Sequence, residues 1–364
     1  MATARKEIYD ATFIQTLGTA IHEQDASFQM VKFLKTCLTA DWVDLKLMQR
    51  CDRITVALHD QLPADFEAAA PILAAIGPKF TGLAAICLPN YVACYGLKHW
   101  QTAMDLLALL TQFSTAEYAI RPFLVAAPEQ TQAQMLAWSS SSVAAIRRLA
   151  SEGMRPRLPW GTRLRQYVAD PAPIFTVLKK LMFDESLYVQ KSVANNLNDI
   201  SKDHPQAVIE FVQNYWGQKK TTDWIIARGL RTLFKQGNTE VLTLLGYAKC
   251  AVMQLKSVNL TPKQQTVQLG KNSTLAYTLT SAAQTELPLY IGYRVHYIRQ
   301  NKVGAFKDFF VKRIVLTPQQ CLSGMLTIKW QPLSTRRLYP GMHLIELLVN
   351  TEVVAASSVI LTMN

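Results

Sequence analysis

Arginine side chains are concentrated in one stretch, residues 147–160, which ends at Trp160 and is followed at once by Arg163 and Arg165. Between Arg147 and Arg165 there are six arginines, one acid and no lysine. Because a glycine and two prolines interrupt the stretch, part of it must form a loop. A basic loop that ends in a tryptophan offers guanidinium groups to phosphates and a flat π surface. The alternative is a solvated helix end with one tryptophan in the core.

The positive charge of the chain belongs to its central and C-terminal parts. The net charge is +12. Residues 141–235 carry 15 basic and 8 acidic side chains, residues 250–364 carry 12 and 4, and residues 1–140 are slightly acidic. A polyanion is the natural partner of such a field, with nucleic acid as the first candidate and an anionic membrane as the second.

Helices of a repeated type must position the central basic residues. Three segments, residues 143–153, 189–199 and 225–235, each combine small residues and Val, Ile or Leu with Arg, Lys or Asn. Their spacing is roughly that of HEAT repeats, about 40–47 residues. Amphipathic patterns over residues 6–60 and Ala- and Leu-rich runs further on also indicate helices. We therefore predict a superhelical solenoid of paired helices over residues 1–248, with a basic concave surface.

The pattern changes from helical to alternating near residue 250. About seven short alternating segments, separated by turn residues, follow between residues 252 and 362. This number of strands in such a length is typical of an immunoglobulin-like sandwich. We therefore predict a multidomain chain, in which the all-α HEAT-like solenoid of residues 1–248 is followed by an all-β immunoglobulin-like sandwich of residues 249–364.

Metal, membrane and export signals do not emerge from the sequence. The six cysteines and six histidines are scattered, and none stands at zinc-ligand spacing. No stretch has the roughly 18 consecutive apolar residues that a membrane span needs, and the first residues do not form a hydrophobic signal segment. We therefore expect reduced thiols, no metal or other cofactor, no membrane partner, and a cytoplasmic location.

Four sequence blocks in order resemble the AlkC branch of the HEAT-repeat DNA alkylation repair glycosylases. The blocks are residues 115–123, 147–160, 192–205 and 227–233, and the resemblance covers about residues 5–245. Some members of that family carry a C-terminal immunoglobulin-like domain, which agrees with the alternating tail. One departure is Gln190, where the family pattern leads us to expect an arginine that contacts phosphate.

The resemblance implies a monofunctional DNA glycosylase that excises cationic N-alkylated bases, such as 3-methyladenine and 3-methylcytosine, from double-stranded DNA. The alkylated base already carries positive charge, so it leaves without a strong acid. The difficult species is an oxocarbenium-like sugar, which a carboxylate beside C1′ stabilises while it orients the attacking water. Aromatic faces hold the cationic base by cation–π attraction. We expect a monomer that binds duplex DNA with alkylated bases.

By the same resemblance, the carboxylates of Asp199 and Glu117 are the catalytic candidates, and Trp160, Glu152 and Arg148 line the lesion site. Each residue also has a plainer interpretation. Asp199 could cap the next segment or pair with Lys202, Glu117 could cap its helix, and Trp160 could fill the core. For Glu152 we favour a role as the partner of a neighbouring arginine.

Polar side chains on the predicted inner helices and the basic loop are the candidates for contacts with the DNA backbone. They are Arg147, Arg155, Arg157, Arg163, Lys191, Asn195, Arg228 and Arg231. A solvated helix face is the alternative for Arg228 and Arg231. Basic residues of the β region could also reach DNA, namely Lys307, Lys312, Arg313, Arg336 and Arg337, or the region could only stabilise the protein. We expect Trp138 and Trp224 to lie in the core.

Two other functions remain open on the sequence. The first is a non-catalytic HEAT-repeat scaffold that recognises bent or damaged DNA, with salt-dependent affinity and no excision. An acid such as Asp199 within a basic field argues against it, because a pure phosphate binder gains nothing from that acid. The second is a solenoid that binds another protein.

Overall fold

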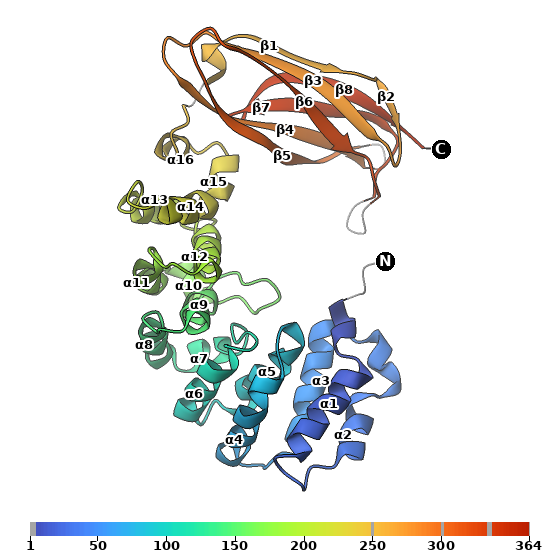
Figure 1. The fold of residues 1–364 in the computed structure, drawn as a ribbon, viewed down its shortest axis with the longest axis vertical. Coiled ribbons are helices and arrows are strands. Elements are labelled where there is room, and N and C mark those ends of the chain that lie inside the picture. Colours follow the sequence, from blue (N-terminus) through green and yellow to red (C-terminus); the bar gives the residue numbers. More distant parts are fainter. Residues whose placement is uncertain (1–4, 249–250, 300–301, 333–336, 364) are drawn as a thin grey trace. The chain divides into compact units, whose positions relative to one another are not determined.

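The computed structural model describes residues 5–248, 251–299, 302–332 and 337–363. The chain divides into two compact units, Met1–Gly229 and Leu230–Asn364. Within the described residues the first unit is helical, and the second contains two short helices followed by β-strands (Figure 1). The order of an all-α part and an all-β part therefore agrees with the sequence. The domain boundary at residues 248 and 249 stays a prediction, because the two compact units meet earlier, at Gly229.

The helical unit consists of short helices joined by tight turns. Its α-helices are α1 (Ala11–His22), α2 (Met30–Cys37), α3 (Leu47–His59), α4 (Phe66–Ile76), α5 (Cys87–Tyr95), α6 (Trp100–Leu110), α7 (Arg121–Ala126), α8 (Pro128–Trp138), α9 (Ala144–Glu152), α10 (Arg165–Ala169), α11 (Ala172–Leu181), α12 (Leu187–Ile200), α13 (Pro205–Gln213) and α14 (Lys220–Gly229). Short 3-10 helices stand between some of them, over Arg5–Ile8, Ala40–Asp44, Gly77–Lys79 and Leu83–Ile86. Successive helices pack on one another, as a solenoid requires.

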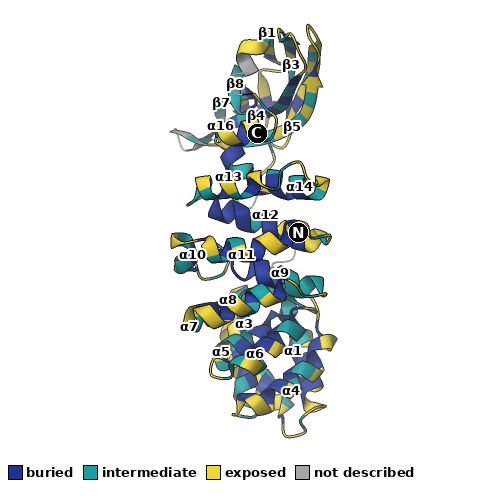
Figure 2. Cartoon of the chain, turned by 90° about the vertical axis from the view of Figure 1, so that its left-hand side faces the viewer, coloured by how far each residue is buried: buried dark blue, intermediate teal, exposed yellow. Residues whose placement is uncertain are grey.

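Helix α12 is the centre of the C-terminal part of this unit. It packs against both α9 and α14, and Figure 2 shows it buried along most of its length. Small side chains permit these close approaches. A Cβ atom at Gly229 of α14 would lie 3.0 Å from the Cβ of Leu197 on α12. The close packing of α9, α12 and α14 brings residues about 40 positions apart in the sequence into contact, as the repeat pattern predicts.

The third predicted repeat helix, residues 225–235, is two helices. Helix α14 ends at Gly229, and α15 (Arg231–Lys235) begins after Leu230. The side-chain amide of Asn198 donates to the carbonyl oxygen of Gly229 at 3.0 Å, which gives this carbonyl a partner at the helix end. Helix α16 (Thr239–Leu244) follows in the second unit. The prediction of one continuous helix was wrong because the glycine that packs on Leu197 also ends its helix.

The β part of the second unit is a two-sheet sandwich. A 3-10 turn (Ala251–Gln254) precedes eight strands: β1 (Leu255–Pro262), β2 (Thr266–Gln268), β3 (Asn272–Ser281), β4 (Leu287–Arg299), β5 (Lys302–Leu316), β6 (Cys321–Lys329), β7 (Gly341–Val349) and β8 (Glu352–Thr362). One sheet has the order β1-β3-β6 and the other β2-β8-β7-β4-β5. All pairs are antiparallel except β2 with β8.

Alternating apolar residues of both sheets form the sandwich core. Trp330 is completely buried there, and its indole N–H donates to the hydroxyl of Ser273 at 2.8 Å. A buried indole needs such an acceptor, because an unpaired polar group in the core is costly. The sequence pattern predicted about seven strands. The short strand β2 lies within the alternating segment of residues 266–269.

Candidate active site

Three buried carboxylates and two buried arginines alternate across three neighbouring segments of the helical unit. The first acid, Glu117, lies in the turn that precedes α7 and is 5% exposed. The guanidinium of Arg148, on α9, donates to it at 2.7 and 3.3 Å, and donates to the hydroxyl of Thr115 at 2.6 Å. Arg148 also lies 3.6 Å from Glu152, one turn later on the same helix. Helix α7 begins only at Arg121, so Glu117 is not a capping residue.

The chain of ion pairs continues from Glu152 to Asp199. Arg155 follows α9, and its guanidinium donates to Glu152 at 2.7 Å and to Asp199 Oδ2 at 2.8 Å. Asp199 stands in the last turn of α12 and is 2% exposed. Its other oxygen, Oδ1, accepts from the ammonium of Lys202 at 2.9 Å. The expected pairing of Asp199 with Lys202 is therefore present, and so is the expected pairing of Glu152 with Arg148 and Arg155.

The neighbouring carboxylates offset the burial of the two arginines. Burial by itself lowers the pKa of Arg148, but the carboxylates of Glu117 and Glu152 raise it, and the net pKa lies above the usual arginine value. The pKa of Arg155 is raised in the same way, because Glu152 and Asp199 outweigh its burial. A protein interior accepts charges at this depth only when they are paired and hydrogen-bonded. The cluster thus holds three acids in fixed positions.

Polar side chains of α9 and α12 fix the middle acid. The hydroxyl of Ser192 lies 2.6 Å from Glu152 Oε2 and 2.9 Å from the hydroxyl of Ser151. The amide of Asn196 donates to the carbonyl oxygen of Ser151 at 2.8 Å. These contacts lock α9 to α12 at the level of Glu152. The position of Glu152 relative to Asp199 is therefore set by two packed helices.

Trp160 lies on an exposed loop that a buried arginine holds. The tryptophan is 55% exposed, so it is not core filler, and its φ of 66° is in the left-handed region. Arg121 is 3% exposed and donates to the carbonyl oxygens of Gly153 at 3.0 Å, Arg155 at 2.9 Å and Thr162 at 2.9 Å. Arg121 thus connects both ends of the loop of residues 153–163, the Trp160 loop, to α7. Burial and the nearby Arg155 lower the pKa of Arg121 to about 10, so it stays charged at neutral pH.

Substitution of Arg121 by lysine should loosen this loop. A lysine ammonium cannot reach three carbonyl oxygens with the fixed fork of a guanidinium, so at least one buried carbonyl loses its donor. We expect faster amide hydrogen exchange over residues 153–163 in the Arg121→Lys protein. Arg53→Lys is the matched control, because Arg53 forms its bidentate pair with Asp41 at the surface. Equal exchange of the loop in both variants would contradict the role given to Arg121.

Three of the expected phosphate ligands use their guanidinium groups within the protein. Arg147 donates to Asp184 at 2.6 and 3.1 Å and to two backbone carbonyls. Arg157 forms a bidentate pair with Asp203 at 2.9 and 2.6 Å. Arg155 is 7% exposed and belongs to the carboxylate cluster. Because a buried and paired guanidinium cannot approach a phosphate, we do not propose Arg155 again as a DNA contact.

The remaining candidates for DNA contacts differ in exposure. Arg163, Lys191 and Arg228 are exposed, and the guanidinium of Arg228 lies 5.5 Å from the ring centroid of Trp224. Trp224 is 38% exposed, which corrects its predicted core position, whereas Trp138 is buried as expected. Asn195 and Arg231 are half-buried, and Arg231 belongs to α15 in the second unit. In the β region Arg336 lies outside the described residues.

Residues that the sequence did not single out complete the cluster. Tyr188 of α12 is 46% exposed and lies under Arg148, with 4.8 Å from guanidinium carbon to ring centroid. Gln190, the departure from the family pattern, is buried and donates to the carbonyl oxygen of Asp184 at 2.8 Å. Tyr118 and Arg121 belong to the sequence block of residues 115–123. Residue type alone could not show that they lie close to the carboxylate cluster.

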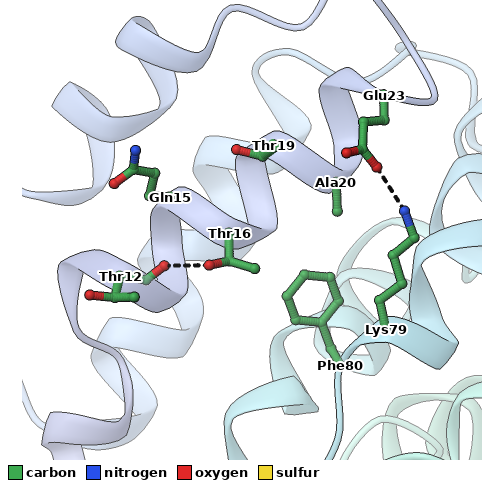
Figure 3. Close-up of a pocket in the computed structure, with 8 residues that line it drawn as sticks. All are labelled: Thr12, Gln15, Thr16, Thr19, Ala20, Glu23, Lys79 and Phe80. Atoms are coloured by element: carbon green, nitrogen blue, oxygen red, sulfur yellow. Dashed lines mark hydrogen bonds and ion pairs between the residues drawn. The ribbon is translucent and has the colours of Figure 1, made fainter.

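A second concave region lies along α1 and does not have the same character. Figure 3 shows the residues that line it, among them three threonines and Gln15 of α1 and, from a separate segment, Lys79 and Phe80. The carboxylate of Glu23 is paired with Lys79 at 2.8 Å, and Thr16 donates to the carbonyl oxygen of Thr12 in its own helix. These are local contacts of surface residues, so we place the site at the carboxylate cluster.

The described residues offer neither a metal site nor a membrane-spanning helix. Within residues 5–248, 251–299, 302–332 and 337–363, no group of three or more His, Cys, Asp or Glu side chains could hold a metal ion. Among the described helices, none has both the length and the apolar character needed to cross a bilayer.

Comparisons with known proteins point in one direction. Residues 98–233 match the family model described as DNA alkylation repair enzyme, and residues 256–363 match the model of the C-terminal Ig-like domain of the uncharacterised protein YhaZ. The chain is 38% identical to the uncharacterised protein YhaZ of Bacillus subtilis over 96% of each chain. It is also similar to the solved structure of Pseudomonas fluorescens alkylpurine DNA glycosylase AlkC bound to DNA with an abasic site analogue. That match has a TM-score of 0.93 and 36% identity over 99% of each chain.

Proposed function

This chain belongs to the DNA alkylation repair enzyme family, and we propose that it is a monofunctional DNA glycosylase that removes cationic N-alkylated bases from double-stranded DNA. The substrate class is 3-methyladenine and 3-methylcytosine in alkylated duplex DNA. The observation that carries the proposal is the row of three buried carboxylates, Glu117, Glu152 and Asp199, which Arg148 and Arg155 connect. The family relation and the similarity to AlkC support the same reaction.

The reaction needs negative charge near C1′ more than it needs an acid. When the glycosidic bond breaks, its electron pair goes to the cationic base, and positive charge moves to the sugar. We propose that Asp199 stabilises this charge and orients the attacking water. Its Oδ2 is held by the buried Arg155, whereas the partner of Oδ1 is Lys202, whose side chain is 41% exposed. A cationic sugar can therefore replace Lys202 at Oδ1 without disturbing Arg155.

We assign recognition of the alkylated base to Trp160 and to the carboxylates of Glu117 and Glu152. Trp160 is 55% exposed, and a cationic base stacked on its ring gains about 0.5–2 kcal/mol by cation–π attraction. Glu117 and Glu152 add negative potential, and Arg148 keeps Glu117 in place at 2.7 Å. An unmodified base carries no charge, so it gains less from this field. Selectivity for damaged bases follows from charge rather than from a deep pocket.

The deciding experiment is the release of free base from methylated DNA. Duplex DNA treated with a methylating agent is incubated with the full-length protein, and the free bases are separated and quantified. We expect 3-methyladenine and 3-methylcytosine in the soluble fraction and an intact sugar–phosphate strand until alkali is added. Strand cleavage without alkali would contradict the monofunctional assignment. No release above a protein-free control would contradict the glycosylase itself.

A non-catalytic DNA scaffold is the second candidate. The observation that favours it is the pairing of each of the three acids with an arginine or lysine, which a purely structural cluster would also show. A scaffold would bind bent or damaged DNA with strong salt dependence and would release no base. The base-release assay therefore separates the two candidates directly.

Arg163 should contribute one phosphate contact in either case. It is exposed on the loop that carries Trp160. The Arg163→Ala substitution should reduce the slope of log affinity against log salt by about 0.9, the value for one phosphate contact. The measurement is a fluorescence-anisotropy titration of duplex DNA at several salt concentrations. Lys32→Ala, an exposed cation on α2, is the control. An unchanged slope for Arg163→Ala would remove this residue from the DNA interface.

A further inference from the structure

A largely apolar groove of about 500 Å³ is bounded on one side by the Trp160 loop. Its walls come from α3, the segment after α5, α7 and the loop itself, with Met48, Leu97, Val125 and Trp160 among the residues that line it. Leu97, Val125 and Trp160 are 42%, 64% and 55% exposed, so the groove opens to solvent through an apolar rim. Its volume is within the range of roughly 300–1,000 Å³ that is typical of small-molecule sites.

Two residues that line the groove connect it to the carboxylate cluster. Tyr118, the neighbour of Glu117, lines the groove. Its pKa is raised to about 12, first by burial and then by Glu117, with smaller effects of Arg148, Glu152 and Arg155, so its hydroxyl lies within electrostatic range of the cluster. Arg121 also lines the groove, and it donates to the carbonyl oxygen of Arg155, the residue that holds Asp199. Tyr118 and Arg121 are therefore shared between the wall of the groove and the surroundings of the cluster.

The groove differs in charge from the cluster, in which carboxylates and arginines alternate. Of the described residues that line it, none is an acid, and Arg121 carries the only formal charge. Three backbone carbonyls occupy the donors of Arg121, so it has little capacity to bind an anion. Its positive charge still disfavours a second cation nearby. Two aromatic rings, Tyr118 and Trp160, offer faces for stacking. The groove suits a planar, neutral molecule.

We propose that this groove binds the free base after excision. This inference rests on the proposed glycosylase function. Before cleavage the alkylated base is a cation, which the three acids attract and Arg121 repels. When the glycosidic bond breaks, its electron pair stays on the base nitrogen, so the base becomes neutral. Water adds to C1′ and loses its proton to solvent. The neutral purine then loses its attraction to the acids and gains a place in the groove, which draws it away from the sugar.

The test uses the full-length protein and free 3-methyladenine without DNA. Calorimetric titration should detect binding to the wild-type protein. Val125→Trp fills the groove from an exposed position and should weaken the affinity about tenfold, the effect of one lost base–aromatic contact. Val31→Trp, at an equally exposed valine of α2, is the matched control and should keep wild-type affinity. Leu97→Trp fills the groove from its other side, so the test does not depend on one variant folding.

Several results would overturn the proposal. One is the absence of binding to the wild-type protein, and another is equal binding by Val31→Trp and both groove variants. A permanently cationic dialkylated adenine that binds as tightly as 3-methyladenine would also overturn it. Base release is measured on the same preparations. If wild-type protein releases base from methylated DNA and either binding result contradicts the groove, only the groove proposal fails. If no base is released, the glycosylase function fails first.

Discussion

Replacement of Asp199 by asparagine should slow the release of methylated base by at least about 100-fold, the usual effect of removing one electrostatic contact to a transition state. The two side chains have nearly the same shape, so the change removes charge rather than packing. Arg155 keeps its second partner, Glu152, at 2.7 Å. The affinity for methylated DNA should therefore change little. Single-turnover release of base under enzyme excess measures the rate, and anisotropy measures the binding.

Asp203 provides the matched control for this experiment. It follows α12 by three residues and, like Asp199, binds an arginine of the 147–160 stretch, with Arg157 at 2.9 and 2.6 Å. Arg157 holds the pKa of this carboxyl below its usual range, so the acid is ionised. The Asp203→Asn protein should release base at close to the wild-type rate. If both asparagine variants lose activity equally, the effect of Asp199 is structural and the catalytic assignment is wrong.

Removal of the Arg155 guanidinium should destabilise the helical unit more than any surface substitution. The Arg155→Met protein leaves the carboxylates of Glu152 and Asp199 without their shared cation, although both are almost completely buried. Loss of one partner of a buried ion pair costs about 3–5 kcal/mol of unfolding free energy. Urea unfolding followed by the helical circular dichroism signal measures this cost, because the helices lie mostly in the first unit.

Two further variants test whether the effect of Arg155 on stability depends on its burial and on its charge. Arg157→Met removes a partly exposed pair and should cost at most about 1 kcal/mol, as exposed pairs do. The double variant Arg155→Met with Asp199→Asn should recover part of the stability lost in Arg155→Met, because one uncompensated charge is gone. A double variant that is less stable than Arg155→Met would show that the arginine acts through packing and not through its charge.

The elements of the fold followed closely from local patterns. Alternation predicted the strands of the sandwich, because a half-buried strand repeats every two residues. Small residues beside aliphatic ones predicted α9 and α12, because small side chains on the facing sides let two helices approach closely. The local patterns failed where one residue has two structural roles. Gly229 lets α14 approach Leu197 and also ends the helix, and no local signal distinguishes that glycine from one inside a helix.

The residue types of the candidate site were also visible in the sequence, through the resemblance to a repair family. What the sequence could not give was the pairing among them. Arg147, Arg155 and Arg157 have the same side chain, and each was expected at phosphate. The structure instead pairs each with an acid 37 to 46 positions away. Such pairs depend on how α9 and the segment after it lie against α12 and its flanking residues, and only the packed solenoid decides that arrangement.

The Trp160 loop shows the same division between sequence and structure. Its prolines and glycine already required a loop, and its tryptophan indicated an aromatic face. Its position depends on Arg121, which precedes it by some 40 residues and binds both ends of it through backbone carbonyls. Composition and spacing therefore determined that this protein has a helical solenoid, a β-sandwich and a basic centre. Only tertiary structure decided which arginines remain at the surface, because burial and long-range pairing are not local properties of the chain.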